Sequence, residues 1–480
     1  MSHTRIPALA TAVLAAAMTA CATQPPPAQA TTQATVTPAT APAQATAQAT
    51  LTPTVTPVGA QAAVSPTAAA ARAGVEVPGT PVGRQLRWLL EVTTRLPVAD
   101  AELAAHFAPG FLARIPPAPL NQALAAFGGM RLTKLDQAQD RSLTAVVTVA
   151  GTAITLALSV DDTGRINYIQ FSAPTPSSWA ELDARLRAAA PRAGFVAAEV
   201  TGDGRCRPLH AVGADEARPL GSMFKLYVLG AVAERIRSGA FGWDTELTIT
   251  PELKSLPSGE LQNRPDGSKV TVLEAARLMI SISDNTATDL LIDKAGRKTV
   301  ERVVRAWGGD ARRNVPFLTT RELFVLKGAD YPRHARRYLS LGTAARRGYL
   351  AQVVAKVPLA KVRPWTAPRD LDTLEWFASP VQVCRAYAHL AKVSDPRVGE
   401  ILSITDAGLR LDQARWPVVW HKGGSEPGLL AMSFLARTAD GRTYVVSTSA
   451  TDPSKPFAEG PVSQELLALT RGAFSLVKPS

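Results

Sequence analysis

A serine and a lysine three residues apart could carry covalent chemistry in the run Ser222-Met223-Phe224-Lys225. The apolar residues 226–236 follow this run and predict a helix that begins near Gly221 and Ser222. Because residues i and i+3 share one helix face, we expect the Lys225 amine to reach the Ser222 hydroxyl. A lysine serves as the base for a serine nucleophile when burial and neighbouring cations lower its pKa. The alternative is a helix-capping serine followed by a surface lysine.

A second polar group, Ser283-Asp284-Asn285, lies between apolar residues and is expected on a buried loop. In this interpretation Ser283 relays a proton between Lys225 and a leaving group, and Asn285 holds a substrate amide. Asp284 is expected to accept hydrogen bonds from local backbone N–H groups and so fix the loop. A helix N-cap is the other interpretation, and it accounts for part of the triplet in any case.

A third run, His421-Lys422-Gly423-Gly424-Ser425, is expected just before a strand. Lys422 would set a positive charge beside a cleft, and the glycines would let a ligand approach the backbone closely. The backbone N–H of Ser425, together with that of Ser222, would form an oxyanion hole. Each donor of this kind typically contributes about 10²–10³ in rate.

The elements that must position these runs belong to a unit that we place at residues 176–480. We expect its first and last segments to share one antiparallel sheet flanked by helices, while the middle forms an all-helical lobe. A cleft between sheet and lobe is then the natural site. The expected helices and strands are 179–190 (helix), 195–200 and 209–212 (hairpin), 429–437 and 443–448 (strands), and 461–474 (helix).

A smaller unit is predicted at residues 82–175, where helical spacing of apolar residues gives way to extended segments. Helices followed by an antiparallel sheet indicate an α+β domain. Its topology resembles the cone-shaped ketosteroid-isomerase and NTF2-like domains, and we expect a binding or spacer module. The expected strands are 130–137, 142–149, 152–160 and 166–172.

The N-terminal residues 1–21 have the features of a lipoprotein signal peptide: Arg5, an apolar stretch, and the run Met18-Thr19-Ala20-Cys21. Lipidation of Cys21 would anchor the exported protein to the outer face of the cell membrane. An ordinary secretory signal is the alternative. Residues 22–81 are rich in Ala, Thr and Pro and are expected to form a disordered linker.

The charge and the composition of the chain bear on whether it binds nucleic acid, a metal or a cofactor. The chain has 480 residues, 52 Lys+Arg and 40 Asp+Glu, which gives a net charge of +12. No nucleic-acid motif accompanies these charges, so we expect no nucleic-acid partner. The basic stretch 297–369 is interpreted as a solvated face, and the alternative is a patch that attracts an anionic polymer, lipid headgroups or an acidic substrate. The histidines and cysteines lack metal-site spacing, so neither metal nor cofactor is expected. In an oxidising compartment Cys206 and Cys384 form a disulfide or remain two buried thiols.

Together the three runs resemble the motifs of the active-site serine penicillin-recognising superfamily, and class A β-lactamases most closely. The whole arrangement also resembles two-domain actinobacterial lipoproteins and the β-lactamase-like protein of clavulanic acid gene clusters. The resemblance implies Ser222 as the acylated nucleophile, Lys225 as its base and Ser283 as a proton relay. It implies substrate binding by four further residues, which are Asn285, Lys422, Gly424 and Ser425.

Two departures from the family pattern concern turnover. The family's E-x-x-L-N loop, whose glutamate activates the deacylating water, is missing: residues 355–379 hold one glutamate, Glu375, close to Ser379-Pro380. Gly423 replaces a hydroxyl-bearing residue that grips the substrate carboxylate. We therefore expect acylation to survive better than efficient β-lactam turnover.

The leading hypothesis is a monomeric, lipid-anchored serine hydrolase that acylates Ser222 on a small-molecule ester or amide, with any β-lactam hydrolysis slow. One rival is a D-Ala-D-Ala carboxypeptidase or penicillin-binding protein that acts on peptidoglycan fragments. Another is a non-catalytic envelope lipoprotein that uses the same fold for binding.

Overall fold

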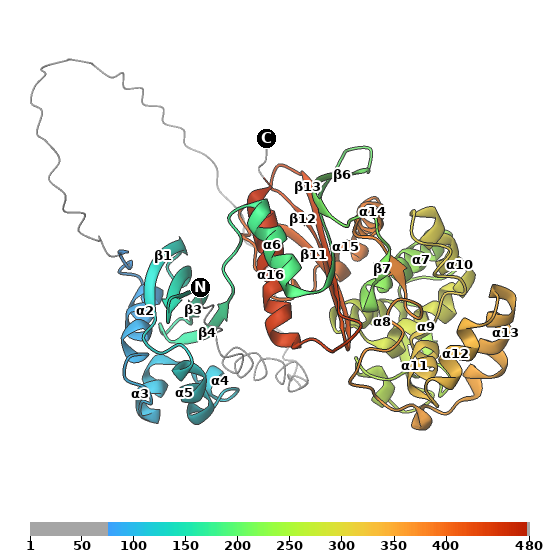
Figure 1. Ribbon diagram of the computed structural model, residues 1–480, viewed down its shortest axis with the longest axis horizontal. Coiled ribbons are helices and arrows are strands. Elements are labelled where there is room, and N and C mark those ends of the chain that lie inside the picture. Colours follow the sequence, from blue (N-terminus) through green and yellow to red (C-terminus); the bar gives the residue numbers. More distant parts are fainter. Residues whose placement is uncertain (1–74, 478–480) are drawn as a thin grey trace, which may run out of the picture.

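Two parts of the chain fold around separate hydrophobic cores in the computed structural model, which describes residues 75–477 (Figure 1). One core lies in the small domain and is built from residues 82–171. The larger part has two apolar clusters, one on each face of its main sheet. The predicted signal peptide, the lipidation of Cys21 and nearly all of the linker lie outside the described residues.

The small domain begins with helices and ends with a four-stranded antiparallel sheet in the order β1-β2-β3-β4. Along β2, Leu143, Ala145 and Val147 are buried, and the residues between them are more exposed, as alternation on a strand requires. The predicted order of elements is therefore correct, while the resemblance to NTF2-like cones stays a prediction. The elements are α2 (Pro81–Val92), α3 (Asp100–His106), α4 (Pro109–Leu112), α5 (Pro117–Ala125), β1 (Arg131–Ala138), β2 (Ser142–Val149), β3 (Thr152–Val160) and β4 (Ile166–Ser172).

A five-stranded antiparallel sheet forms the centre of the larger part, in the order β11-β12-β13-β5-β6. Along β13, Tyr444 and Val446 join the cluster under α6 and α16, whereas Val445 joins the cluster on the opposite face. Helices therefore cover both faces, as Figure 1 shows. The elements are α6 (Trp179–Ala189), β5 (Arg192–Val200), β6 (Cys206–Val212), α14 (Pro380–Ala391), α15 (Pro396–Leu402), β11 (Val418–Glu426), β12 (Leu429–Arg437), β13 (Thr443–Thr451) and α16 (Glu459–Leu476).

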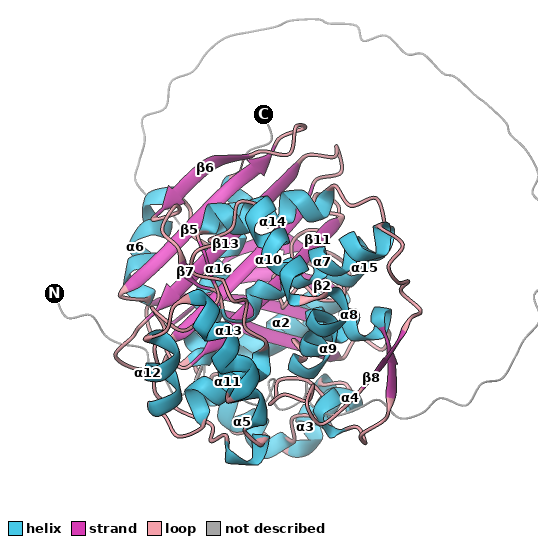
Figure 2. Cartoon of the chain, turned by 90° about the vertical axis from the view of Figure 1, so that its right-hand side faces the viewer, coloured by secondary structure: helices cyan, strands magenta, loops and turns pink. Residues whose placement is uncertain are grey.

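The middle of the chain forms a helical lobe beside this sheet, as predicted (Figure 2). Two short ladders frame it: β7 (Arg218–Pro219) pairs with β10 (Phe377–Ala378), and β8 (Glu246–Thr248) pairs with β9 (Lys269–Thr271). The remaining helices of the lobe are α7 (Lys225–Arg237), α8 (Val272–Ser281), α9 (Asn285–Ala295), α10 (Arg297–Ala306), α11 (Thr320–Gly328), α12 (Arg333–Leu339) and α13 (Thr343–Gln352).

Within residues 75–477, none of the helices has both the length and the apolar character that a bilayer span requires.

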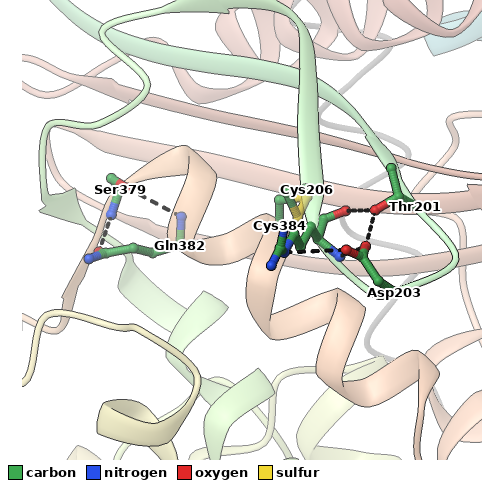
Figure 3. The surroundings of a disulfide bond; sticks show 7 residues. Thr201, Asp203, Cys206, Ser379, Gln382 and Cys384 are labelled. Carbon is green, nitrogen blue, oxygen red and sulfur yellow. Dashed lines mark hydrogen bonds and ion pairs between the residues drawn. A yellow bond between two sulfur atoms is a disulfide. The ribbon is translucent and has the colours of Figure 1, made fainter.

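A disulfide joins Cys206 on β6 to Cys384 on α14, with 6.2 Å between their Cα atoms (Figure 3). The bridge was one of two alternatives that the sequence left open, and the structure excludes the pair of free thiols. The Ser379 hydroxyl accepts from Gln382 N and the Gln382 side chain accepts from Ser379 N, so a capping box fixes the start of α14. The bridge thus ties the sheet's edge strand to a helix with a defined start.

Replacing both cysteines, Cys206→Ala with Cys384→Ala, removes a link between residues 178 positions apart. Because such a link restricts the unfolded chain, we expect the free energy of unfolding to fall by about 2–5 kcal/mol. Urea unfolding of the oxidised wild type and the double variant measures the difference. Coincident unfolding curves would contradict a stabilising role for the bridge.

Candidate active site

A cleft of about 810 Å³ opens between β11 and the helical lobe, and all three predicted runs contribute to its lining. Figure 2 views the molecule from the lobe side, with the sheet behind. The lining includes Ser222, Ser283, Asn285, Lys422 and Ser425. The fold therefore brings together residues more than 200 positions apart in the sequence.

Ser222 lies on a 3₁₀ turn, Gly221–Phe224, that runs directly into α7. The α-helix therefore begins at Lys225, three residues later than predicted. In a 3₁₀ turn the side chains at i and i+3 eclipse, which places Ser222 and Lys225 on the same side. Two contacts with Trp376 fix the turn. Leu220 N donates a hydrogen bond to Trp376 O at 2.8 Å, and the rings of Phe224 and Trp376 stack with 3.7 Å between their centroids.

Lys225 is completely buried, and its amine makes three hydrogen bonds within the second motif. Its Nζ donates to Ser283 O at 2.6 Å, to Ser283 Oγ at 3.0 Å and to Asn285 Oδ1 at 2.7 Å. Burial, and then the neighbouring Lys422, lower the pKa of Lys225 well below its ordinary value, against a smaller opposing effect of Asp284 and Asp289. A lysine in this environment gives up its proton readily and can act as a base.

Ser283 Oγ lies between two amines. Lys422 Nζ donates to it at 3.1 Å and to Gly423 O at 2.8 Å, so the hydroxyl joins Lys422 to Lys225. Burial lowers the pKa of Lys422 to about 7. Ser283 has a φ of +59°, in the left-handed region that non-glycine residues seldom adopt. Backbone strain of this kind persists where the surrounding structure fixes the residue, and it concentrates at functional sites.

Asp284 fixes the loop that carries Ser283, as the sequence indicates. Its Oδ1 accepts from Ala287 N, which caps α9, and its Oδ2 accepts from the N–H groups of Glu260 and Leu261. The Nδ2 of Asn285 donates a hydrogen bond to Leu256 O, and its Oδ1 accepts one from the Lys225 amine. The amide of Asn285 therefore positions the lysine, and its predicted role as a substrate clamp stays a prediction.

Gly424 of the third motif has a structural reason that the sequence did not reveal. The motif lies within β11 and not before a strand, which corrects the prediction. A Cβ on Gly424 would lie 2.3 Å from Leu220 O and 2.4 Å from Ser222 N. A Cβ on Gly221 would also be too close to its neighbours, because it would lie 2.9 Å from Ser425 N. The φ of Gly221 is +49°, which residues other than glycine rarely adopt. The strand thus packs against the serine turn through backbone alone, and the N–H groups of Ser222 and Ser425 belong to adjacent segments.

A buried cluster that sequence reasoning missed forms part of the cleft wall. Lys327 Nζ on α11 donates to Glu426 Oε1 at 2.6 Å and to Glu375 Oε1 at 3.3 Å, and both carboxyl groups line the cleft. Burial raises the pKa of Glu426 well above its ordinary value, and Glu375 adds to this rise. The partners lie 48 and 99 residues from Lys327, so no local pattern could have identified the cluster.

Comparison with known proteins agrees with this arrangement. A family model described as the beta-lactamase enzyme family matches residues 178–467. The chain belongs to that family. A second model, described as the ORF 12 gene product N-terminal, matches residues 77–166 and thus most of the small domain. The beta-lactamase family match spans the sheet, the lobe and all three motifs.

Individual relatives are distant. The beta-lactamase regulatory protein BlaB of Streptomyces cacaoi is 25% identical over 265 residues, which cover 53% of this chain and 83% of BlaB. The solved structure of PBP-A is 19% identical and covers 63% of this chain and 99% of its own, with a TM-score of 0.42. A beta-lactamase from Sphaerobacter thermophilus is 18% identical over 63% of this chain and 100% of its own, with a TM-score of 0.43.

The substitution Gly424→Ala tests the backbone contact between β11 and the serine turn. The new Cβ must displace Leu220 O and Ser222 N, so we expect acylation of Ser222 to slow by about 10²-fold, the effect of losing one oxyanion donor. The rate of labelling by a fluorophosphonate measures this. Gly348→Ala is the matched control, because nothing lies within 4 Å of that Cβ. Equal labelling of both variants would contradict the contact's importance.

Proposed function

We propose that this protein is a serine hydrolase that forms an acyl-enzyme at Ser222 on an ester or amide. The observation that carries the proposal is the Lys225 amine, which is fully buried, donates hydrogen bonds to Ser283 and Asn285 and has a pKa well below its ordinary value. Membership of the beta-lactamase enzyme family supports the same chemistry. Turnover of β-lactams is proposed to be slow, because the family's deacylation motif is missing from the sequence.

The proposed reaction proceeds through proton transfers between Ser222, Lys225 and Ser283, of which Lys225 and Ser283 are hydrogen-bonded to each other. Neutral Lys225 takes the Ser222 proton while Oγ bonds to the carbonyl carbon, and the N–H groups of Ser222 and Ser425 stabilise the oxyanion. Collapse of this intermediate breaks the bond to the leaving group. That group receives its proton from Ser283, which recovers one from Lys225. Attack of water on the acyl-enzyme then releases the acid and restores the Ser222 hydroxyl.

The proposed location of the enzyme rests on the sequence alone. We propose an exported monomer that a lipid on Cys21 anchors to the outer face of the cell membrane, with Asn285, Lys422, Gly424 and Ser425 as the substrate-binding residues. A non-catalytic binding protein at the envelope stays the alternative, and the distant relative BlaB, a beta-lactamase regulatory protein, does not favour it over the enzyme.

Ser222→Ala decides between the enzyme and the binding protein. We expect the variant to lose hydrolysis of p-nitrophenyl acetate and covalent labelling by a fluorophosphonate, because the nucleophile is gone. Lys225→Ala should slow acylation by about 10²–10⁴-fold, as the loss of a general base typically does. Steady-state kinetics and intact-protein mass spectrometry measure both effects. Hydrolysis that persists in folded Ser222→Ala protein would contradict the proposed mechanism.

The pH profile tests the role of Lys422 in tuning the base. Because Lys225 works in its neutral form, kcat/KM should rise as the pH rises through its pKa. The positive charge of Lys422 lowers that pKa, so Lys422→Met should raise it and move the ascending limb to higher pH. Rates with p-nitrophenyl acetate, corrected for uncatalysed hydrolysis, give the profile. If the ascending limb of the profile stays in place or moves to lower pH in Lys422→Met, Lys422 does not lower the pKa of Lys225.

A further inference from the structure

The walls of the cleft are largely apolar. They include Ile282, Leu323, Phe324, Trp365 and Met432, which come from three parts of the lobe and from β12. Ile282 is 40% exposed although it is a large aliphatic residue, and the rings of Phe324 and Trp365 lie 5.9 Å apart. Apolar walls with an exposed aliphatic side chain beside a nucleophile are typical of a site that binds an apolar ligand.

The charged residues of the cleft do not favour an anionic substrate. Among the described residues that line it, the charged types are Lys422, Glu375 and Glu426, and none is an arginine. The Lys422 amine already donates to Ser283 Oγ and Gly423 O. Gly423 itself has no hydroxyl that could help to hold a carboxylate. Glu375 and Glu426 are paired with Lys327. Lys422 is therefore the one cation among the described lining residues that a substrate carboxylate could meet, and its amine is already hydrogen-bonded.

From these observations we infer that the site takes uncharged esters or amides with a bulky apolar acyl group, and that a free carboxylate on that group hinders acylation. The inference rests on the proposed acylation of Ser222 and names its substrate class. Burial of the acyl chain supplies the binding energy, because each CH₂ removed from water favours the complex. An unpaired carboxylate in the same place loses its hydration without gaining a partner.

The protonation of the cleft residues agrees with this inference. Burial lowers the pKa of Lys422 to about 7, so near neutral pH this amine is only partly charged. Burial raises the pKa of Glu426 well above its ordinary value, which favours a neutral carboxyl group in the wall. Both effects make the cleft less polar at the pH at which acylation is expected.

Three p-nitrophenyl esters with the same leaving group test the inference: the acetate, the hexanoate and the mono-adipate. The hexanoyl and adipoyl groups have equal length, and a terminal carboxylate replaces the terminal methyl group in the latter. We expect kcat/KM to be at least about tenfold higher for the hexanoate than for the acetate, since each buried CH₂ favours the complex by up to about fourfold. The mono-adipate should be hydrolysed no faster than the acetate.

Two variants locate the preference in the cleft. Ile282→Ala should lower the hexanoate-to-acetate ratio about threefold or more, since it removes exposed apolar wall. Leu209→Ala, which removes a 37% exposed leucine on the edge strand β6, should leave the ratio unchanged. Gly423→Ser restores a hydroxyl beside Lys422 and should raise the mono-adipate rate relative to the hexanoate rate.

The outcomes separate the two proposals. A mono-adipate that reacts as fast as the hexanoate or faster, in a reaction abolished by Ser222→Ala, overturns the substrate class and leaves the nucleophile intact. The substrate class is also overturned if Ile282→Ala and Leu209→Ala change the hexanoate-to-acetate ratio equally. If no ester is hydrolysed in a manner that depends on Ser222, the proposed function fails and the inference fails with it.

Discussion

The structure keeps two buried lysine amines within hydrogen-bond distance of one serine hydroxyl. Lys225 Nζ and Lys422 Nζ lie 3.0 and 3.1 Å from Ser283 Oγ. Two ammonium groups this close repel each other, and burial weakens both charges further, so the arrangement favours loss of a proton. The proposed chemistry at Ser222 depends on that loss, because a charged Lys225 cannot accept the serine proton.

The surrounding fold holds this unfavourable arrangement in place. Asp284 accepts three backbone hydrogen bonds and so fixes the strained turn at Ser283. Gly221 and Gly424 let β11 contact the serine turn without side chains between them. The cluster around Lys327 joins the lobe to the end of β11. The contacts of Gly424 and Lys327 link segments distant in the sequence, so the site depends on the sheet and the lobe keeping their relative position.

Local patterns in the sequence predicted much of this fold. Alternation of apolar residues located strands β2 to β4 correctly, and turn residues located the β5–β6 hairpin. The motifs indicated which side chains would line one cleft. The 3₁₀ turn before Lys225 and the position of the third motif inside β11 were missed, because both follow from packing between β11 and the serine turn. The Cys206–Cys384 bridge stayed one of two alternatives and the Lys327 cluster was not predicted, since both depend on distances between remote segments.

The state of the Lys225 amine is the centre of this account, and it can be titrated directly. Carbon-13 labelled lysine side chains give NMR signals whose shifts follow protonation, and Lys225→Arg identifies the signal by its disappearance. The account predicts that Lys225 titrates well below 10.5, the ordinary value for lysine. A Lys225 that keeps its proton up to that value would contradict the account, because the proposed base would then be charged throughout the working pH range.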